Sequence, residues 1–211
     1  MEDSLKKVLI INGHQPYPFA KGRLNGTFAA LMREHLERRG YQVEFTEVSK
    51  GWDVETEVAR HQWADALVMQ FPVNWMGTPW SLKKYMDEVY TAGMDGRLCQ
   101  GDGRRGPGQD HLYGLGGALT DTRYMLSLTF NAPRDAFGNP NAAFFEQRTV
   151  DDLLWPMHLN LRFFGMTALP TFSAHDVMKN PDVEGDLARF RAHLEATFPA
   201  YTLSLHDALP I

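Results

Sequence analysis

The chain alternates between short apolar runs and longer segments in which apolar residues recur every three or four positions. The apolar runs predict strands, and they lie at residues 8–11 (VLII), 41–48, 66–71, 124–130 and 166–172. The segments with the longer period predict amphipathic helices, at residues 24–39, 53–64, 80–93, 149–165 and 182–198. Asp53 is the expected N-cap of the second helix, and Pro79 and Gly93 are expected to bound the third.

This alternation predicts an α/β domain. Parallel strands need crossover connections, and the right-handed sense of these connections places helices on either side of a sheet. We therefore expect a five-stranded parallel sheet with helices on both faces, forming one domain over residues 1–199. Residues 200–211 follow Pro199 without continuing the helical pattern, and we expect them to form a tail outside the fold.

Two long segments interrupt the alternation. Residues 93–117 contain nine of the 18 glycines of the chain, together with three arginines. A loop of this length in a compact domain is usually either functional or disordered. The second segment, residues 131–149, is rich in proline and asparagine and contains Phe137, Phe144 and Phe145. These aromatic residues indicate either a binding lip or subunit interface, or a small cluster tucked under the loop.

Composition narrows the range of functions. The net charge of -5 and the pI near 5.9 argue against a nucleic-acid partner. Cys99 is the single cysteine, so no internal disulfide is possible, and no stretch approaches the roughly 18 apolar residues of a membrane span. We therefore expect a cytoplasmic protein without stable membrane insertion. No metal is expected, because HExxH and Cys/His ligand spacings are absent from the sequence, and no GxSxG motif indicates a serine hydrolase.

An open parallel sheet binds ligands beyond the carboxyl ends of its strands. Three loops are expected at that end, at residues 14–27, 71–80 and 129–132. The first lacks both GxGxxG and GxxxxGK[ST], which disfavours a Rossmann dinucleotide site and a P-loop. Its stretch GRLNGT opens a helix whose first amides could hold a phosphate, although an ordinary capped helix with solvated charges fits these residues equally well.

The loop FPVNWMGTPW at residues 71–80 is the most informative of the three. Trp75 and Trp80 offer large flat apolar surfaces, two prolines stiffen the turn, and Gly77 lets the backbone approach a ligand closely. We expect free backbone N–H groups at residues 73–76. A planar heteroaromatic ligand would fit such a wall. The alternative interpretation is that both tryptophans belong to the core.

Six segments occur in the order KKVLIINGH, FAKGRLNGT, FPVNWMGTPWSLKKYMDEVYTAG, YGLGGAL, YMLSLTFNAP and LPTFSAHDV. Together they resemble the modulator of drug activity B family of flavodoxin-like NADPH:quinone oxidoreductases, from about residue 6 to residue 198. The resemblance implies a flavodoxin-like fold and noncovalently bound FAD, with FMN the less expected flavin. It further implies NADPH as co-substrate, two-electron reduction of a quinone by ping-pong hydride transfer, and a homodimer with the flavin near the subunit interface.

Carried over residue by residue, the resemblance places the pyrophosphate and adenosine side of FAD at Ala20, Lys21, Gly22, Arg23, Leu24, Asn25, Gly26 and Thr27. It places the flavin ring at Val73, Asn74, Trp75 and Met76, completed by Tyr113, Thr129, Phe130, Asn131 and Ala132. Val73 and Asn74 stand where a relative within this family has glycine and tryptophan. Backbone contacts to the flavin are expected to persist, because they do not depend on side chains, whereas the side chain that would stack on the ring stays open. His14, Tyr113 and His158 are candidate proton donors to the hydroquinone, besides solvent.

Two other functions remain open from the sequence. A flavodoxin-type electron carrier would bind FMN and exchange single electrons with protein partners. Flavodoxin-like relatives also serve as ancillary regulatory subunits of potassium efflux transporters. The sequence names neither the physiological quinone nor a preference for NADPH over NADH.

Overall fold

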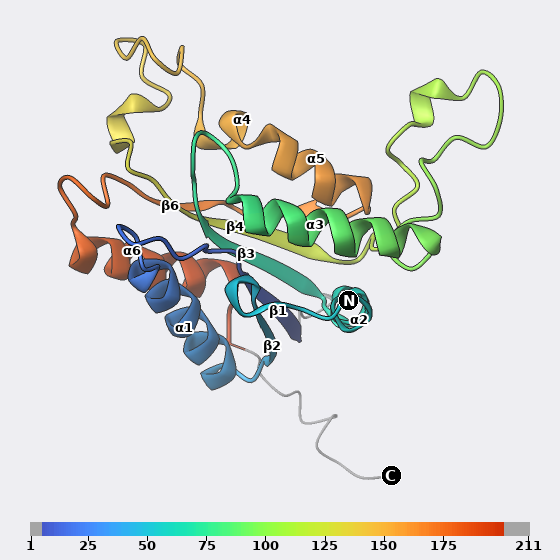
Figure 1. Cartoon of the computed structure of the whole chain (residues 1–211), viewed down its shortest axis with the longest axis horizontal. Helices are drawn as coiled ribbons and strands as arrows, with labels where there is room; N and C mark the ends of the chain where they lie inside the picture. The colour runs from blue at the N-terminus through green and yellow to red at the C-terminus, as the bar shows by residue number, and fades with distance from the viewer. Residues whose placement is uncertain (1–5, 201–211) are drawn as a thin grey trace.

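The computed structural model describes residues 6–200 as a single sheet with helices packed on both faces (Figure 1). The strands are β1 (Lys7–Asn12), β2 (Gln42–Glu47), β3 (Ala66–Pro72), β4 (Arg123–Thr129), β5 (Thr167–Ala168) and β6 (Phe172–Ala174). The helices are α1 (Arg23–Arg38), α2 (Val54–Trp63), α3 (Trp80–Ala92), α4 (Val150–Leu153), α5 (Trp155–Phe163) and α6 (Val183–Thr197). Short 3-10 helices cover Val48–Lys50, Gly93–Asp95, Asp110–Leu112 and Arg134–Ala136.

The sheet is parallel throughout and runs in the order β2-β1-β3-β4-β5, with β6 also paired to β4. The chain moves outward from β1 to β2 and then crosses back to β3, so the direction of the connections reverses between β1 and β3. Ligands bind beyond the carboxyl ends of the strands at such a switch in flavodoxin-like sheets. The predicted fold class is therefore confirmed, and the topology points to one end of the sheet.

Two predicted elements are wrong in detail. The expected fifth strand, residues 166–172, is two short strands, of which β5 pairs with the start of β4 and β6 with its end. Pro170 lies between them, and a proline has no N–H to donate to the ladder. The expected helix at residues 149–165 breaks at Leu154, which is the N-cap of α5. Pro156 lies in the first turn of α5, where no intrahelical hydrogen bond needs its missing N–H. In a helix continuing from α4, the same residue would have had to donate an N–H to the preceding turn, which proline cannot do.

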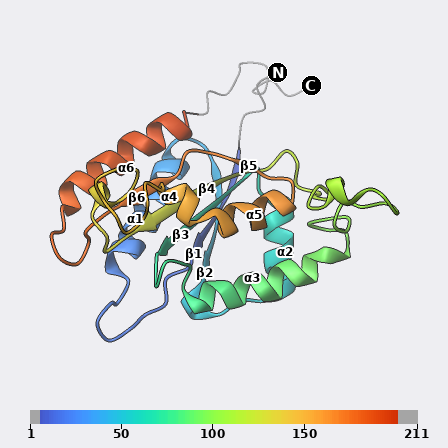
Figure 2. The ribbon, with the colours of Figure 1, turned by 90° about the horizontal axis from the view of Figure 1, so that it is seen from above.

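The core consists of two apolar clusters, one on each face of the sheet. In β1, Val8 and Ile10 belong to the cluster under α1 and α6, whereas Leu9 and Ile11 belong to the cluster under α2, α3 and α5. Figure 2 shows α1 and α6 on one side of the strands and α3 and α5 on the other. Because both faces are covered, four successive residues of β1, Val8 to Ile11, are apolar.

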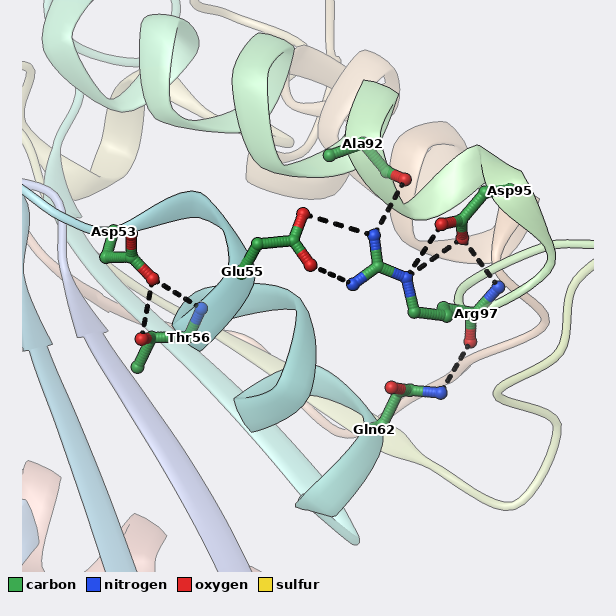
Figure 3. Close-up of polar contacts among 7 residues, drawn as sticks. All are labelled: Asp53, Glu55, Thr56, Gln62, Ala92, Asp95 and Arg97. Atoms are coloured by element: carbon green, nitrogen blue, oxygen red, sulfur yellow. Dashed lines mark hydrogen bonds and ion pairs between the residues drawn. The ribbon is translucent and has the colours of Figure 1, made fainter.

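The glycine-rich residues 93–117 form a protrusion that is anchored at its base by Arg97 (Figure 3). The guanidinium lies 2.6 Å from Glu55 of α2 and 2.9 Å from Asp95, and it donates to the carbonyl of Ala92 at 3.3 Å. The hydrogen bond from Arg97 is the main cause that lowers the pKa of Asp95. These contacts tie the start of the protrusion to α2 and to the end of α3.

Other predicted boundaries agree with the structure. Asp53 caps α2 by accepting from the N–H of Thr56 at 2.9 Å (Figure 3), and α3 lies between Pro79 and Gly93. Residues 1–5 and 201–211, which include most of the predicted tail, lie outside the described residues. Among the described residues, no helix combines the length and the hydropathy that a membrane crossing needs.

Candidate functional site

A chain of buried hydrogen bonds joins α1, β3 and β4 at the carboxyl end of the sheet. Ser127 donates to Oε1 of Gln70 at 2.7 Å, and Nε2 of Gln70 donates to Oδ1 of Asn25 at 2.8 Å. Nδ2 of Asn25 then donates to Oγ1 of Thr129 at 3.2 Å. All of these side chains are buried. These hydrogen bonds therefore fix the first turn of α1 relative to β3 and β4.

The first turn of α1 forms a cradle suited to an anion. Gly22 is its N-cap, with a φ of 77° and no side-chain capping hydrogen bond, so the first amides of the helix lack partners from a cap. A Cβ at Gly22 would lie 2.2 Å from Nδ1 of His14. Glycine is thus required both by the left-handed backbone and by the histidine ring. Helix N-termini of this kind bind phosphate groups.

A cavity of about 320 Å³ lies beside this cradle. It runs from the start of α1 along the helix toward the end of β2, and its volume lies within the range of small-molecule sites. Its lining consists of Asn12, His14, Pro16, Lys21, Gly22, Gly26, Ala30, Arg33, Phe45, Glu47 and Ser49. The side chain of Asn25 is absent from this lining, because it is engaged below with Gln70 and Thr129.

The loop after β3 presents a tryptophan on a tight turn. Asn74 and Gly77 exchange backbone hydrogen bonds of 2.9 and 3.0 Å across a two-residue loop. Trp75 and Met76 have φ values of 48° and 64°, as a type I′ turn requires. A non-glycine residue in a sparsely populated region costs roughly 1–3 kcal/mol. Trp75 is 98% exposed, so burial of its ring does not offset this cost. Strain and exposure together indicate a loop shaped for a ligand or a partner.

The backbone of this loop corrects one prediction. The N–H of Val73 donates to the carbonyl of Thr129 at 2.9 Å, and that of Asn74 is used in the turn, so neither is free. Within residues 6–200, no hydrogen bond engages the N–H of Trp75 or Met76. The interpretation of both tryptophans as core residues is also wrong. Trp80 is 61% exposed, because α3 begins beyond the carboxyl end of β3.

The segment 129–132 continues β4 at the same end of the sheet. Phe130 is buried, and its N–H donates to the carbonyl of Ala174 in β6 at 2.8 Å. Asn131 is exposed and Ala132 is half-buried. The structure thus brings the three predicted loops together, but the side chain of Phe130 packs into the protein.

His14 is the candidate proton donor that lies at this end of the sheet. Its ring lines the cavity and packs against Gly22. Burial lowers the pKa of His14, while a hydrogen bond with the backbone of Ala20 and the charge of Glu47 act in the opposite direction. The balance favours the neutral ring.

The other two candidate donors lie elsewhere. Nδ1 of His158 lies 2.8 Å from the hydroxyl of Tyr124, and Nε2 lies 3.2 Å from Asp151, so the buried histidine of α5 links the buried Tyr124 of β4 to the exposed Asp151 of α4. Tyr113 is 64% exposed, and its ring packs at 6.1 Å from that of Phe163 at the end of α5. Figure 1 shows its protrusion, residues 93–117, well away from the loop after β3. Within one chain, neither residue joins the three loops.

Sequence reasoning missed the polar residues beneath the loops. Gln70 and Ser127 each stand inside an otherwise apolar strand, in ALVMQF and YMLSLTF, and that exception is the signal that could have marked them. A polar side chain at a fully buried position needs a partner, which these two residues find in each other.

Comparison with known proteins agrees with this geometry. Residues 6–198 match the family described as having a flavodoxin-like fold. The chain belongs to this family. It is 42% identical over 191 residues to the NADPH:quinone oxidoreductase MdaB of Haemophilus influenzae, a match that covers 90% of this chain and 98% of that protein. The resemblance inferred from the six sequence segments is thereby confirmed.

Two solved structures share the fold. One is an NADPH-quinone reductase from P. pentosaceus, with a TM-score of 0.64, 17% identity, and 93% of this chain and 100% of that chain covered. The other is general stress protein 14 from Treponema denticola in complex with FMN, with a TM-score of 0.64, 20% identity, and 91% and 99% covered. At these identities the likeness concerns the fold.

The cradle predicts opposite effects of alanine at two neighbouring glycines. Gly22→Ala should lower the free energy of unfolding by about 2 kcal/mol or more, because a left-handed alanine alone costs roughly 1–2 kcal/mol and its Cβ would also meet His14. Gly26→Ala is the matched control, since nothing lies within 4 Å of its Cβ. A helical alanine there should raise stability by roughly 0.5–1 kcal/mol. Urea unfolding of the flavin-free protein measures both, and equal effects would contradict the described cradle.

The buried hydrogen bonds of Asn25 predict that this side chain contributes to the stability of the fold more than to ligand binding. Asn25→Ala leaves Gln70 and Thr129 without their partner and should destabilise the fold by about 1–3 kcal/mol. Asn131→Ala, at an exposed position of the neighbouring loop, should change stability by less than about 0.5 kcal/mol. Thermal unfolding of flavin-free protein gives the comparison. Wild-type stability of Asn25→Ala combined with weak flavin retention would instead assign the Asn25 side chain to the ligand.

Proposed function

We propose that this protein is an FAD-dependent NAD(P)H:quinone oxidoreductase that transfers two electrons while NAD(P)H and quinone bind in turn. The observation that carries the proposal is the meeting of three loops at the switch between β1 and β3. There the buried hydrogen bonds of Asn25 tie the cradle of α1 to Gln70 and Thr129. The N–H of Val73 donates to the carbonyl of Thr129 and so ties the strained turn of Trp75 to the segment 129–132. The 42% identity to a NADPH:quinone oxidoreductase supports the reaction.

The residues present fit a flavin. The amides at the start of α1, together with Lys21, would hold the phosphates, because a helix N-terminus and a cation both favour negative charge. The turn at Trp75 and the segment 129–132 would flank the ring. The cavity continues along α1 to Phe45 and Glu47. That extension favours FAD over FMN, because an adenosine attached beyond the pyrophosphate would occupy it.

The chemistry divides between cofactor and protein. A bound flavin would supply the group that takes hydride from NAD(P)H and passes it to the quinone, so that NAD(P)H, one proton and quinone yield NAD(P)⁺ and hydroquinone. The protein orients the reactants and stabilises charge, and the unengaged N–H groups of Trp75 and Met76 are suited to negative charge on the ring. Because burial keeps His14 neutral, we assign the proton to solvent.

The first test is the reaction itself. The purified protein should be yellow, should release FAD on denaturation as identified by mass, and should oxidise NADPH rapidly when menadione is added. A flavodoxin-type carrier would instead release FMN and oxidise NADPH slowly. Absence of menadione-dependent NADPH oxidation after reconstitution with FAD and, separately, with FMN would refute the proposal.

The same site favours a homodimer. A flavin at the carboxyl end of an open sheet leaves one face of its ring toward solvent, where reduced flavin loses electrons to oxygen. Phe144 is 74% exposed in the loop 131–149, whereas Phe145 stacks on Phe137 with centroids 4.2 Å apart. Phe144 is thus the ring available to cover a neighbouring site. Tyr113, remote from the site in its own chain, would reach a flavin only across a subunit contact.

The dimer predicts separable effects within this aromatic loop. Light scattering at micromolar concentration should give a mass near twice the 24.0 kDa of one chain. Phe144→Ala should raise the KM for menadione several-fold with little change in melting temperature, because its ring is exposed. Phe137→Ala, which removes a packed ring, should mainly lower the melting temperature. A single-chain mass with full quinone reductase activity would exclude the shared site.

A further inference from the structure

A histidine ring links the end of β4 to the aromatic loop. His175, which follows β6, is 9% exposed, and its ring lies parallel to that of Phe130 with centroids 5.2 Å apart and 7° between planes. It also meets the ring of Phe137 at 5.5 Å and 61°. Phe137 in turn stacks on Phe145. Phe137 also meets the ring of Phe130 directly, at 5.1 Å and 63°. The histidine is therefore the third ring of a cluster that joins the segment 129–132 to the outer part of the loop.

Both ring nitrogens of His175 have hydrogen-bond partners. Nδ1 lies 3.3 Å from the carbonyl oxygen of Ala132, and Nε2 lies 2.9 Å from the hydroxyl of Ser173. A carbonyl oxygen only accepts, so Nδ1 carries the hydrogen and the serine hydroxyl donates to Nε2. Burial, followed by the charge of Arg134, lowers the pKa of His175 to about 4. The ring is therefore neutral near pH 7, and this arrangement of donors is maintained.

The loop 131–149 needs such an attachment. Its backbone hydrogen bonds from Gly138 to Arg148 and from Arg148 to Phe145 close the loop on itself, without fixing it to the sheet. Attachment to the sheet comes from the ring of Phe137, which contacts the rings of His175 and, at 5.1 Å, of Phe130. Two hydrogen bonds add to it: Nη2 of Arg134 donates to the carbonyl of Ser173 at 3.1 Å, and the N–H of Asp176 donates to that of Ala132 at 3.2 Å. Phe144, at the outer end of the loop, depends on this attachment for its position.

We propose that His175 is a positioning residue for quinone reduction, which holds the carbonyl of Ala132 and the Phe137–Phe145 pair in place over the carboxyl end of the sheet. The inference rests on the proposed function, since it assigns the loop to the wall of the quinone site. His175 itself is buried behind Phe130 and acts through the residues it holds. Its loss should therefore change how the quinone binds more than how fast bound quinone is reduced.

Two variants distinguish the contribution of the His175 ring from that of its hydrogen bonds. His175→Asn keeps an amide N–H near the place of Nδ1 and removes the ring, whereas His175→Phe keeps a ring and removes both hydrogen bonds. His193→Phe is the matched control on α6. Nε2 of His193 also contacts a backbone carbonyl, that of Pro170 at 3.0 Å, and its ring also lies near a phenylalanine, Phe172 at 5.6 Å. This control has the same chemistry without contact to the loop.

Amide hydrogen exchange in flavin-free protein measures directly how firmly the loop 131–149 is attached. In His175→Asn, the amides of residues 137–148 should exchange faster, on the order of tenfold, which is the size expected for one lost aromatic contact with its packing. Peptides from β3 should exchange as in the wild type. His175→Phe should leave residues 137–148 close to wild type, because the ring contacts remain, and His193→Phe should leave them unchanged.

Steady-state kinetics of the FAD-loaded protein measure the effect of this attachment on quinone binding. His175→Asn should raise the KM for menadione on the order of tenfold while kcat changes by less than about twofold. His175→Phe should raise this KM by roughly threefold, through the lost bond to Ala132. The control should match the wild type.

Unchanged exchange of residues 137–148 in His175→Asn overturns the inference, and so does faster exchange with an unchanged KM for menadione. If His175→Asn does not fold, a wild-type KM in His175→Phe overturns it. A wild-type protein that reduces no quinone refutes the proposed function, whereas the exchange experiment, which needs no flavin, separately decides whether His175 anchors the loop.

Discussion

The hydrogen-bonded chain from Ser127 through Gln70 and Asn25 to Thr129 is the constraint on which the site depends. Buried polar groups lose their hydrogen bonds to water, so each needs a partner in the fold. Here the partners come from α1, β3 and β4, and a shift of any one element would leave an amide or a hydroxyl unpaired. These hydrogen bonds thus join the start of α1 and the ends of β3 and β4 into one rigid unit. The cradle at Gly22 keeps its place over the sheet for this reason.

The same unit carries the strained loop. The turn at Trp75 and Met76 has positive φ at both central residues, which costs free energy without burying the tryptophan. Such a turn persists when its ends are fixed, and they are: Val73 is bonded to the carbonyl of Thr129, and Asn74 to that of Gly77. Rigid strands therefore hold a conformation that the loop would not adopt alone. This combination of a stable scaffold with strained, exposed loops is common where proteins bind ligands.

The long insertions lie at separate places around the sheet. The protrusion of residues 93–117 is anchored to α2 by Arg97, and the loop 131–149 is attached to β6 through His175. The protrusion of residues 93–117 extends away from the loop after β3 (Figure 1), and Tyr113 within it packs on Phe163. The loop 131–149 places the ring of Phe137 against that of Phe130 in the segment 129–132. The proposed homodimer would give the exposed rings of both insertions a partner surface.

By itself, the sequence determined the order of strands and helices, the cap at Asp53 and the family, because burial on both faces of a parallel sheet leaves a periodic pattern that neighbouring residues reveal. Only the tertiary structure decided that β5 and β6 are separate, since this depends on which part of β4 each strand pairs with. It also decided that the side chain of Asn25 turns inward, because its partners Gln70 and Thr129 lie 45 and 104 positions away. The same holds for Tyr113, whose ring packs against that of Phe163, 50 positions away, and not against the three loops. Contacts between distant residues depend on how the elements assemble, and local periodicity carries no record of them.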